Sequence, residues 1–146
     1  HPFDIEWVTD STTSPNVKKF HPTALYELIM KFKDTGLPIF ITENGIDDGE
    51  DKFREEFLVA HLSAVHKAIE DGANVIGYQY WALADTWEPG EYRFSEMGMI
   101  KIDRNNNLNR SLRPSASLYG EIIKTHTIKK ELLEKYKRSL QTQRTP

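Results

Sequence analysis

The chain has 146 residues, carries 19 basic and 22 acidic side chains for a net charge of −3, and contains no cysteine. This length suits one domain with a core of its own, but it is short for a complete eight-stranded α/β barrel, which needs roughly 200 to 400 residues. The slight acidity lacks the basic footprint of a nucleic-acid partner, no apolar run reaches the roughly 18 residues of a membrane span, and the absence of cysteine excludes disulfides and thiolate chemistry.

The first part of the chain predicts an irregular segment, a helix and a strand. Residues 1–20 are interrupted by Ser, Thr, Pro and Asn, which break regular elements. A helix is expected to begin at residues 21–23, where Pro stands in the first turn, and to end at Gly36. The short apolar run 37–41 then predicts a buried parallel strand that ends near Glu43.

The middle of the chain contains the strongest helical pattern. Residues 44–51 are polar and predict a loop, and residues 52–71 predict a helix closed by Gly72. The apolar stripe expected on this helix consists of Leu58, Leu62, Val65 and Ile69. Residues 75–81 predict a second buried strand, and a strand–helix–strand unit favours a parallel sheet.

The last third of the chain predicts a loop, a hairpin and two helices. We expect a long polar loop over 82–96, a hairpin from 97–102 and 108–112, a helix over 114–123 and a charged last helix over 129–140. Two parallel strands alone do not make a stable sheet. The chain is therefore either a small sheet covered by helices and the hairpin, or part of a larger barrel.

Candidate functional side chains follow both predicted parallel strands. Functional groups of α/β barrels lie at the carboxyl ends of the strands. Here the first strand ends at Glu43 and the second at Trp81, followed by Asp85, Trp87 and Glu88. Indole rings stack on sugars and carboxylates accept their hydroxyl hydrogens, so this composition suits a carbohydrate. Taken singly, each residue has a plainer interpretation as a solvated loop carboxylate, a core indole or a turn cap.

Two blocks of the sequence carry a more specific signal. Residues 40–45 read F-I-T-E-N-G, and residues 77–88 read G-Y-Q-Y-W-A-L-A-D-T-W-E. These blocks resemble the T-E-N-G and W-S-L-x-D-N-[FY]-E-W signatures of glycoside hydrolase family 1, in the family's order and at its separation. Later residues resemble the C-terminal hairpin and last helix of that family, namely Gly98, 101–103 and 113–116. The sequence of these motifs is most similar to the archaeal β-glycosidase branch of the family.

The resemblance implies an α/β fold, the C-terminal part of a (β/α)8 TIM barrel with its last two strand–helix units, a β-hairpin and a final helix. Residues 1–126 would form this barrel segment, and residues 127–146 a charged tail, helical or frayed. The implied activity is that of a retaining β-glycosidase acting on terminal β-linked sugars such as β-glucosides or β-galactosides, with no cofactor and no metal.

The resemblance also assigns roles to individual residues. Glu43 matches the catalytic nucleophile, and Trp81 matches the ring beneath the bound sugar. Glu88 matches the carboxylate that holds the outer hydroxyls of the sugar. Asn44 and Trp87 complete the expected substrate-binding set. All of these roles are expectations carried over from the family motif.

Four positions bear on how closely the chain follows the family pattern. Asp85 matches a motif position whose role we take as structural, orienting the loop. Pro89 stands where the family usually has Trp, Met97 stands where the family has Phe in R-F-G, and Thr86 stands where Asn is common. These departures leave the sugar preference open.

Two further clusters have plain interpretations. The acidic residues of the loop after the first strand predict a solvated surface, namely Asp47, Asp48, Glu50 and Asp51. His61 and His66 are five residues apart, which is a poor spacing for a metal pair on a helix.

The chain lacks one block that the family requires. A retaining glycosidase needs two carboxyl groups roughly 5 to 5.5 Å apart. The family supplies its acid/base from an N-E-P block on the fourth strand, and no N-E-P occurs in these 146 residues. We therefore expect a chain that carries the nucleophile but not the acid/base. Its expected partners are a small carbohydrate and the missing N-terminal barrel part, with no nucleic acid and no membrane.

Two rival interpretations remain at this stage. One is a catalytically inactive truncated or remnant chain, at most a weak sugar-binding module, which Pro89 and Met97 favour slightly. The other is a small unrelated α/β domain. The chain begins at His1 without Met or a signal-peptide pattern, which suggests a fragment, a processed chain or a trimmed one, and the composition permits a cytoplasmic protein.

Overall fold

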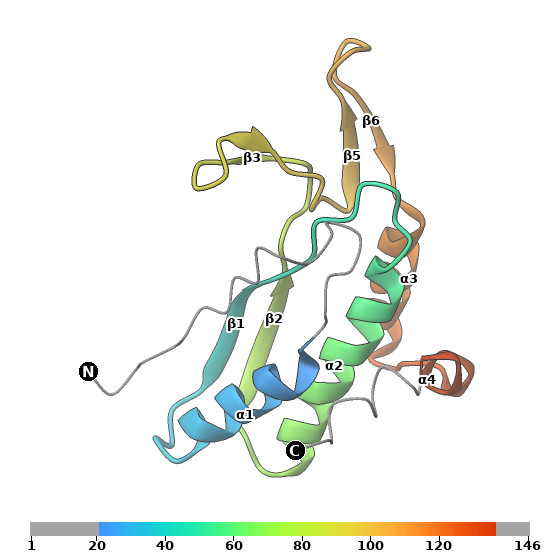
Figure 1. Ribbon diagram of the computed structural model, residues 1–146. Helices are drawn as coiled ribbons and strands as arrows, with labels where there is room; N and C mark the ends of the chain where they lie inside the picture. The colour runs from blue at the N-terminus through green and yellow to red at the C-terminus, as the bar shows by residue number, and fades with distance from the viewer. Residues whose placement is uncertain (1–20, 137–146) are drawn as a thin grey trace.

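The computed structural model describes residues 21–136 as an α/β arrangement (Figure 1). Its elements, in chain order, are α1 (Pro22–Lys33), β1 (Ile39–Asn44), α2 (Arg54–Glu70), β2 (Val75–Tyr80), β3 (Trp87–Glu88), β4 (Arg93–Phe94), β5 (Ile100–Asp103), β6 (Asn109–Leu112), α3 (Pro114–Thr125) and α4 (Lys130–Lys135). The expectations for residues 1–20 and 137–140 lie outside the described residues. No helix within residues 21–136 combines the length and the apolar character needed to cross a bilayer.

The β1–β2 pair is a parallel two-stranded sheet with one covered face. Its register places Ile39 opposite Val75 and Ile41 opposite Tyr78. Ile41 is 8% exposed and points to the helices, whereas Phe40 and Ile76 are 48% and 62% exposed on the other side. Within the described part of the chain, β1 and β2 form a sheet only with each other, and no closed barrel results. Parallel strands are normally covered on both faces, so this sheet has the character of a segment of a larger one.

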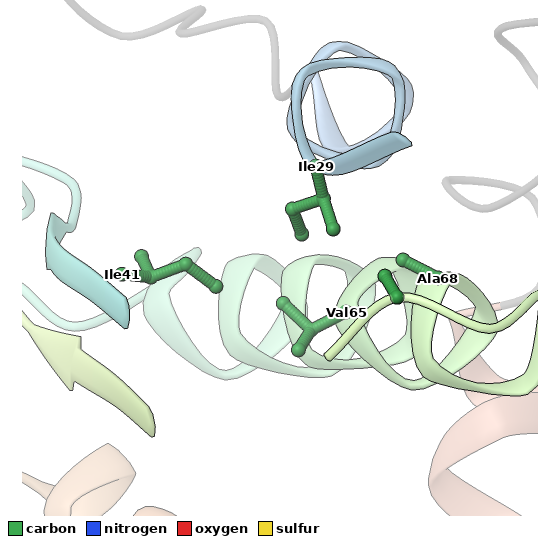
Figure 2. Packing of buried hydrophobic residues seen from close by; sticks show 5 residues of the cluster. Ile29, Ile41, Val65 and Ala68 are labelled. Atoms are coloured by element: carbon green, nitrogen blue, oxygen red, sulfur yellow. The ribbon is translucent and has the colours of Figure 1, made fainter. Parts of the chain in front are cut away.

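An apolar cluster joins α1, β1 and α2. Figure 2 shows Ile29 of α1 and Ile41 of β1 pointing toward Val65 and Ala68 of α2. A second cluster lies under the carboxyl ends of the strands and consists of Ile46, Phe57, Leu58, Tyr80 and Met99. Helix α2 contributes to both clusters and so connects the base of the sheet to its functional end.

Most helix and strand limits follow the expected signals. Pro22 is the first helical residue of α1, and Gly36 and Gly72 follow α1 and α2 with positive φ angles of 71° and 94°, which glycine adopts without strain. The expected place of Ile69 in the apolar stripe is wrong, because this residue is exposed. At 100° per residue, Ile69 falls at the margin of the face centred on Val65 and Ala68, in the last turn of the helix.

The expected loop over 82–96 is wrong in one respect. It contains the short antiparallel hairpin β3–β4, in which Trp87 pairs with Phe94. The expected hairpin from 97 onward is present as β5–β6, and it projects beyond the carboxyl ends of β1 and β2 (Figure 1). Its first strand begins only at Ile100, because the segment before it bonds to the chain after β2 instead, with the Met99 N–H donating to the Ala82 carbonyl at 2.9 Å.

The last expected helix is present but short. Helix α4 ends at Lys135 and has no buried residue. The Tyr136 hydroxyl donates to Glu55 of α2 at 2.9 Å, so a side chain just past the helix ties it to the rest of the fold.

The apolar cluster at the base of the sheet predicts the effect of a truncation in α1. Ile29→Ala removes a side chain that is 2% exposed and leaves a cavity against α2, so it should lower the free energy of unfolding by about 2 to 5 kcal/mol. Urea unfolding followed by far-UV circular dichroism measures this change. The matched control is Leu28→Ala, one residue away and 41% exposed, which should cost less than about 1 kcal/mol. Equal losses for the two variants would contradict the packing described.

Candidate functional site

The carboxyl ends of β1 and β2 bring three of the expected site residues together. Glu43 and Asn44 are the last residues of β1, and Trp81 directly follows β2. The Trp81 N–H donates to the Asn44 carbonyl at 3.0 Å, and the Tyr78 hydroxyl donates to Asn44 Oδ1 at 2.8 Å. The peptide bond from Trp81 to Ala82 is cis. Backbone and side chain of Asn44 are therefore both bound to β2 and to the residue after it.

Gly45 explains why the two strand ends come so close. A Cβ atom on Gly45 would lie 1.6 Å from the Trp81 carbonyl oxygen and 2.7 Å from its carbon. Only a residue without a side chain leaves room for the Trp81 backbone at this point. The last residue of the T-E-N-G block is thus required by the contact between the two strand ends.

Glu88 lies on the β3–β4 hairpin and is bound to the same cluster. The Trp81 indole Nε1 donates to Glu88 Oε1 at 3.4 Å, and the buried Ser95 hydroxyl lies 3.3 Å from the same oxygen. The Ser95 N–H donates to the Thr86 carbonyl at 2.8 Å, which keeps this hydroxyl beside the hairpin. The indole thus donates to one oxygen of the carboxylate, and the single Ser95 hydroxyl proton has this oxygen and the Thr86 carbonyl as acceptors, both at 3.3 Å.

Trp87 is placed differently from the other candidates. Its ring packs edge-on against the Phe94 ring, with centroids 5.0 Å apart, and it makes no hydrogen bond to Asn44, Trp81 or Glu88. The Arg104 guanidinium carbon lies over the same Phe94 ring, 3.7 Å from its centroid. Trp87 therefore stabilises the hairpin and keeps part of its ring exposed.

The chemical character of the assembled site is acidic and aromatic. Glu43 is exposed, and its carboxylate makes no hydrogen bond to any other residue between 21 and 136. Trp81 and Trp87 are exposed on the same end of the sheet, where Figure 1 shows β3 beyond the carboxyl ends of β1 and β2. Carboxylates can accept hydrogen bonds from sugar hydroxyls or attack an electrophilic carbon, and an indole face can support a sugar ring.

The structure confirms the structural interpretation of Asp85. Its carboxylate is buried and accepts two hydrogen bonds from Arg113, at 2.7 and 3.2 Å. It also accepts from the N–H groups of Gly98 and Ile102, at 3.0 and 3.1 Å. A bidentate, fully bonded buried pair of this kind holds the loop after β2 against the β5–β6 hairpin.

The interpretation of the acidic loop as a solvated surface is wrong for three of its four residues. The Asp47 side chain is only 14% exposed and accepts from the Glu96 N–H at 3.0 Å. Asp48 is buried and accepts from the N–H groups of Lys52, Phe53 and Arg54, at 3.2, 2.8 and 3.0 Å. Asp51 accepts from the N–H and hydroxyl of Ser115, at 2.8 and 2.6 Å. Free N–H groups at the start of α2 and of α3 attract these carboxylates. Glu50, whose side chain is 74% exposed, fits the original interpretation.

The supporting residues were missed by sequence reasoning. Asp48 could have been recognised, because an Asp shortly before a helix is a capping signal. Arg54, Ser95 and Arg113 carry no local signal of burial, since their partners are distant in sequence. All three are nonetheless buried beneath the site.

The histidines of α2 do not form a metal site. Burial lowers the pKa of His61 to about 4, and its ring stacks on Phe57 with centroids 3.8 Å apart, so it belongs to the core. His66 is exposed, and its Nε2 lies 3.5 Å from Glu70 Oε1. Across residues 21–136, no three His, Asp or Glu side chains gather in a way that could hold a metal ion.

Comparison with known proteins connects this arrangement to one family. The sequence profile of glycosyl hydrolase family 1 matches residues 5–128. The chain belongs to this family. The β-galactosidase of Sulfolobus acidocaldarius is 38% identical to this family 1 chain over 117 residues, which cover 78% of the chain and 23% of that protein. The chloroplastic β-glucosidase-like SFR2 of Oryza sativa subsp. japonica is 31% identical over 131 residues, which cover 87% of the chain and 20% of that protein.

Solved structures agree with the sequence relatives. The β-glycosidase from Pyrococcus horikoshii superposes with a TM-score of 0.73 and 42% identity, over 80% of this chain and 27% of that one. The β-glucosidase from Pyrococcus furiosus gives a TM-score of 0.72 and 36% identity, over 80% and 26%. The family 1 chain spans between 20% and 23% of the length of the curated relatives. Its fold is therefore the C-terminal part of a TIM barrel, as expected.

The buried pair of Asp85 and Arg113 predicts a large loss of stability on truncation. Asp85→Ala leaves the Arg113 guanidinium buried without its carboxylate and should lower the free energy of unfolding by about 3 to 5 kcal/mol. The control is Glu121→Ala, which removes an exposed partner of Lys129 at 2.8 Å and should cost at most about 1 kcal/mol. Thermal unfolding of both variants compares the two losses. Similar losses of stability in the two variants would show that the pair of Asp85 and Arg113 does not hold the loop after β2 against the β5–β6 hairpin.

The contact between Gly45 and Trp81 predicts a strong steric effect. Gly45→Ala pushes the loop after β1 away from the Trp81 carbonyl and should destabilise the fold by about 1 to 3 kcal/mol. Gly90→Ala is the control, because a Cβ atom there meets nothing within 4 Å. Urea unfolding distinguishes the two, and a neutral Gly45→Ala would contradict the close approach.

Proposed function

We propose that this chain is the nucleophile-bearing part of a retaining β-glycosidase. Glu43 is the nucleophile, Trp81 supports the sugar ring, and Glu88 accepts hydrogen bonds from the outer hydroxyls. Asn44 and Trp87 complete the binding set. The substrate class is a terminal β-linked sugar such as a β-glucoside or β-galactoside, in keeping with the activities that the names of the relatives carry.

The observation that carries the proposal is the hydrogen-bonded cluster at the strand ends. Trp81 donates to both Asn44 and Glu88, and Asn44 directly follows Glu43. Glu88 is thus an oriented carboxylate beside the exposed Trp81 indole. The exposed Glu43 carboxylate projects from the neighbouring strand end, whose backbone is bound to Trp81 through Asn44. Such rigidity is what an attack on one carbon of a bound sugar requires.

The chemistry of the first step follows from the retaining mechanism. A Glu43 carboxylate oxygen attacks the anomeric carbon, the bond from that carbon to the aglycone oxygen breaks, and a glycosyl ester forms. The departing oxygen takes a proton from an acid that this chain does not contain. In the second step a water molecule gives up a proton to the same external group and attacks the anomeric carbon, which releases the sugar and the Glu43 carboxylate.

Because this chain lacks the acid/base, we expect another part of a barrel to supply it and to pack against the β1–β2 sheet. The outward face of β1–β2 carries the exposed side chains of Phe40 and Ile76, and both outer edges of the sheet lack a strand partner within residues 21–136. Unpaired edges and apolar faces favour association with further strands. The partner proposed here is the N-terminal part of a barrel, which supplies the remaining strands and the acid/base.

The test uses a completed barrel, in which residues 5–128 of this chain replace the matching part of the Pyrococcus horikoshii β-glycosidase. An activated 2-deoxy-2-fluoro glucoside or galactoside should add one sugar mass to this protein, and peptide mapping should locate the ester on Glu43. Glu43→Gln should abolish labelling and lower turnover by about 10³-fold or more, because an amide is a poor nucleophile. Intact-protein mass spectrometry and steady-state kinetics provide the two measurements.

The matched control is Glu50→Gln, which changes an exposed carboxyl group in the loop after β1 and should leave labelling and turnover unchanged. Labelling at another residue, or full turnover by Glu43→Gln, would refute the assigned nucleophile. Sugar binding without labelling in the completed barrel would favour the rival function of a non-catalytic sugar-binding remnant, which Pro89 and Met97 suggest.

A further inference from the structure

Among the residues that the structure describes (21–136), Arg54 is the most completely buried charged residue outside the site. It is the first residue of α2, and its side chain has 0% exposure. Its guanidinium donates to the Tyr80 hydroxyl at 2.8 Å, to the carbonyls of Asp48 and Glu96 at 2.8 Å each, and to the Asp51 carboxylate. The mechanism proposed above uses none of these contacts.

Three of the four acceptors of Arg54 belong to the two loops that carry the site, and the fourth lies at the end of β2. Asp48 and Asp51 lie in the loop that follows Glu43 and β1. Glu96 lies just after the β3–β4 hairpin that carries Glu88. Tyr80 is the last residue of β2, next to Trp81. One side chain therefore bonds to the chain on both sides of the site.

Short paths lead from these acceptors to the site residues. The Tyr80 hydroxyl also bonds to the backbone of Ile46, donating to its carbonyl at 3.3 Å and accepting from its N–H at 3.4 Å, three residues after Glu43. On the other side, Glu96 follows Ser95, whose hydroxyl contacts the Glu88 carboxylate. Rotation or loss of the Arg54 guanidinium would therefore displace the backbone near Glu43 and the hydroxyl that contacts Glu88.

The two loops also bond directly to each other around this point. The Glu96 carbonyl accepts from the Asp48 N–H at 3.3 Å as well as from Arg54, and the Glu96 N–H donates to Asp47 at 3.0 Å. Gly49 completes the contact, since a Cβ atom there would lie 2.2 Å from the Glu96 carboxylate. The Arg54 guanidinium bonds to both loops in the part of this contact that is fully buried.

We propose that Arg54 is a positioning residue, which sets the placement of Glu43 relative to Glu88 by holding the loop after β1 against the β3–β4 hairpin. This inference rests on the proposed function. The planar fork of a guanidinium directs several donors at once, whereas a lysine ammonium has three donors around one point. A lysine at this position would keep the charge but could not serve acceptors on both loops.

The experiment measures how fast the completed barrel is labelled by the 2-deoxy-2-fluoro sugar. Arg54→Lys should lower the labelling rate about tenfold or more, because small displacements of a nucleophile have large kinetic effects. Tyr80→Phe removes one acceptor without changing charge and should lower the rate by a few-fold. For both variants the label, where formed, should still map to Glu43.

Two comparisons separate positioning from loss of stability. Ile29→Ala destabilises the distant apolar cluster and should be labelled at the unaltered rate at temperatures where the protein is folded. Arg54→Ala should regain labelling when guanidinium ion is added at millimolar concentration, and methylammonium ion should not restore it. The rescue is measured at a temperature at which Arg54→Ala is folded without added guanidinium, so that regained labelling does not reflect refolding.

The outcomes distinguish this inference from the proposed function. If Glu43→Gln is labelled as fast as the unaltered protein, the proposed function fails. If Glu43→Gln is inert, but Arg54→Lys and Tyr80→Phe are labelled as fast as Ile29→Ala, the positioning role of Arg54 is overturned and the proposed function stands.

Discussion

A guanidinium group withdrawn from water must direct its N–H groups at acceptors, and this constraint organises the functional end of the chain. Arg54 and Arg113 are both buried there. The acceptors that surround them are backbone carbonyls and carboxylates of the two loops that follow β1 and β2, together with the Tyr80 hydroxyl at the end of β2. Each loop therefore has a preferred position that depends on the other, and the carboxylates of Glu43 and Glu88 are placed by the same arrangement.

The two halves of the fold are stabilised in different ways. At the base of the sheet, α1, β1 and α2 share an apolar cluster around Ile29, which contributes stability in proportion to the area removed from water. Beneath the site, buried ion pairs and helix caps lie next to the second apolar cluster. Buried pairs contribute little net stability compared with apolar side chains of the same volume, but they impose direction and distance. Directional polar contacts therefore fix the geometry of the site, and apolar packing at the base of the sheet supplies stability.

Local signals predicted most elements because their causes are local. Pro22, Gly36 and Gly72 mark helix ends through their own backbone preferences, and the periodicity of α2 is visible in its sequence. The β3–β4 hairpin was missed although Pro89 and Gly90 offered a turn signal at its tip. Ile69 was assigned to the core because periodicity gives the direction of a side chain, whereas exposure depends on whether another element covers that turn.

Contacts between distant residues account for what local signals could not predict. Asp51 and Ser115 are 64 residues apart, and Arg54 and Glu96 are 42 apart. No spacing or period records such a pair, so the acidic loop gave no indication of which carboxylates turn inward. Only the completed packing decides this, because free helix N–H groups and buried guanidinium groups select the nearest acceptor.

The sequence by itself determined the family resemblance, the α/β class and the order of the candidate site residues, because these depend on short motifs and on helical or strand periodicity. The tertiary structure alone decided that Gly45 must accommodate the Trp81 backbone, that Asp48 and Asp51 cap helices, and that Arg54 joins the two loops. The physical reason is that these roles arise from close approach of segments far apart in the chain, where burial makes every unpaired polar group costly and so selects a single arrangement.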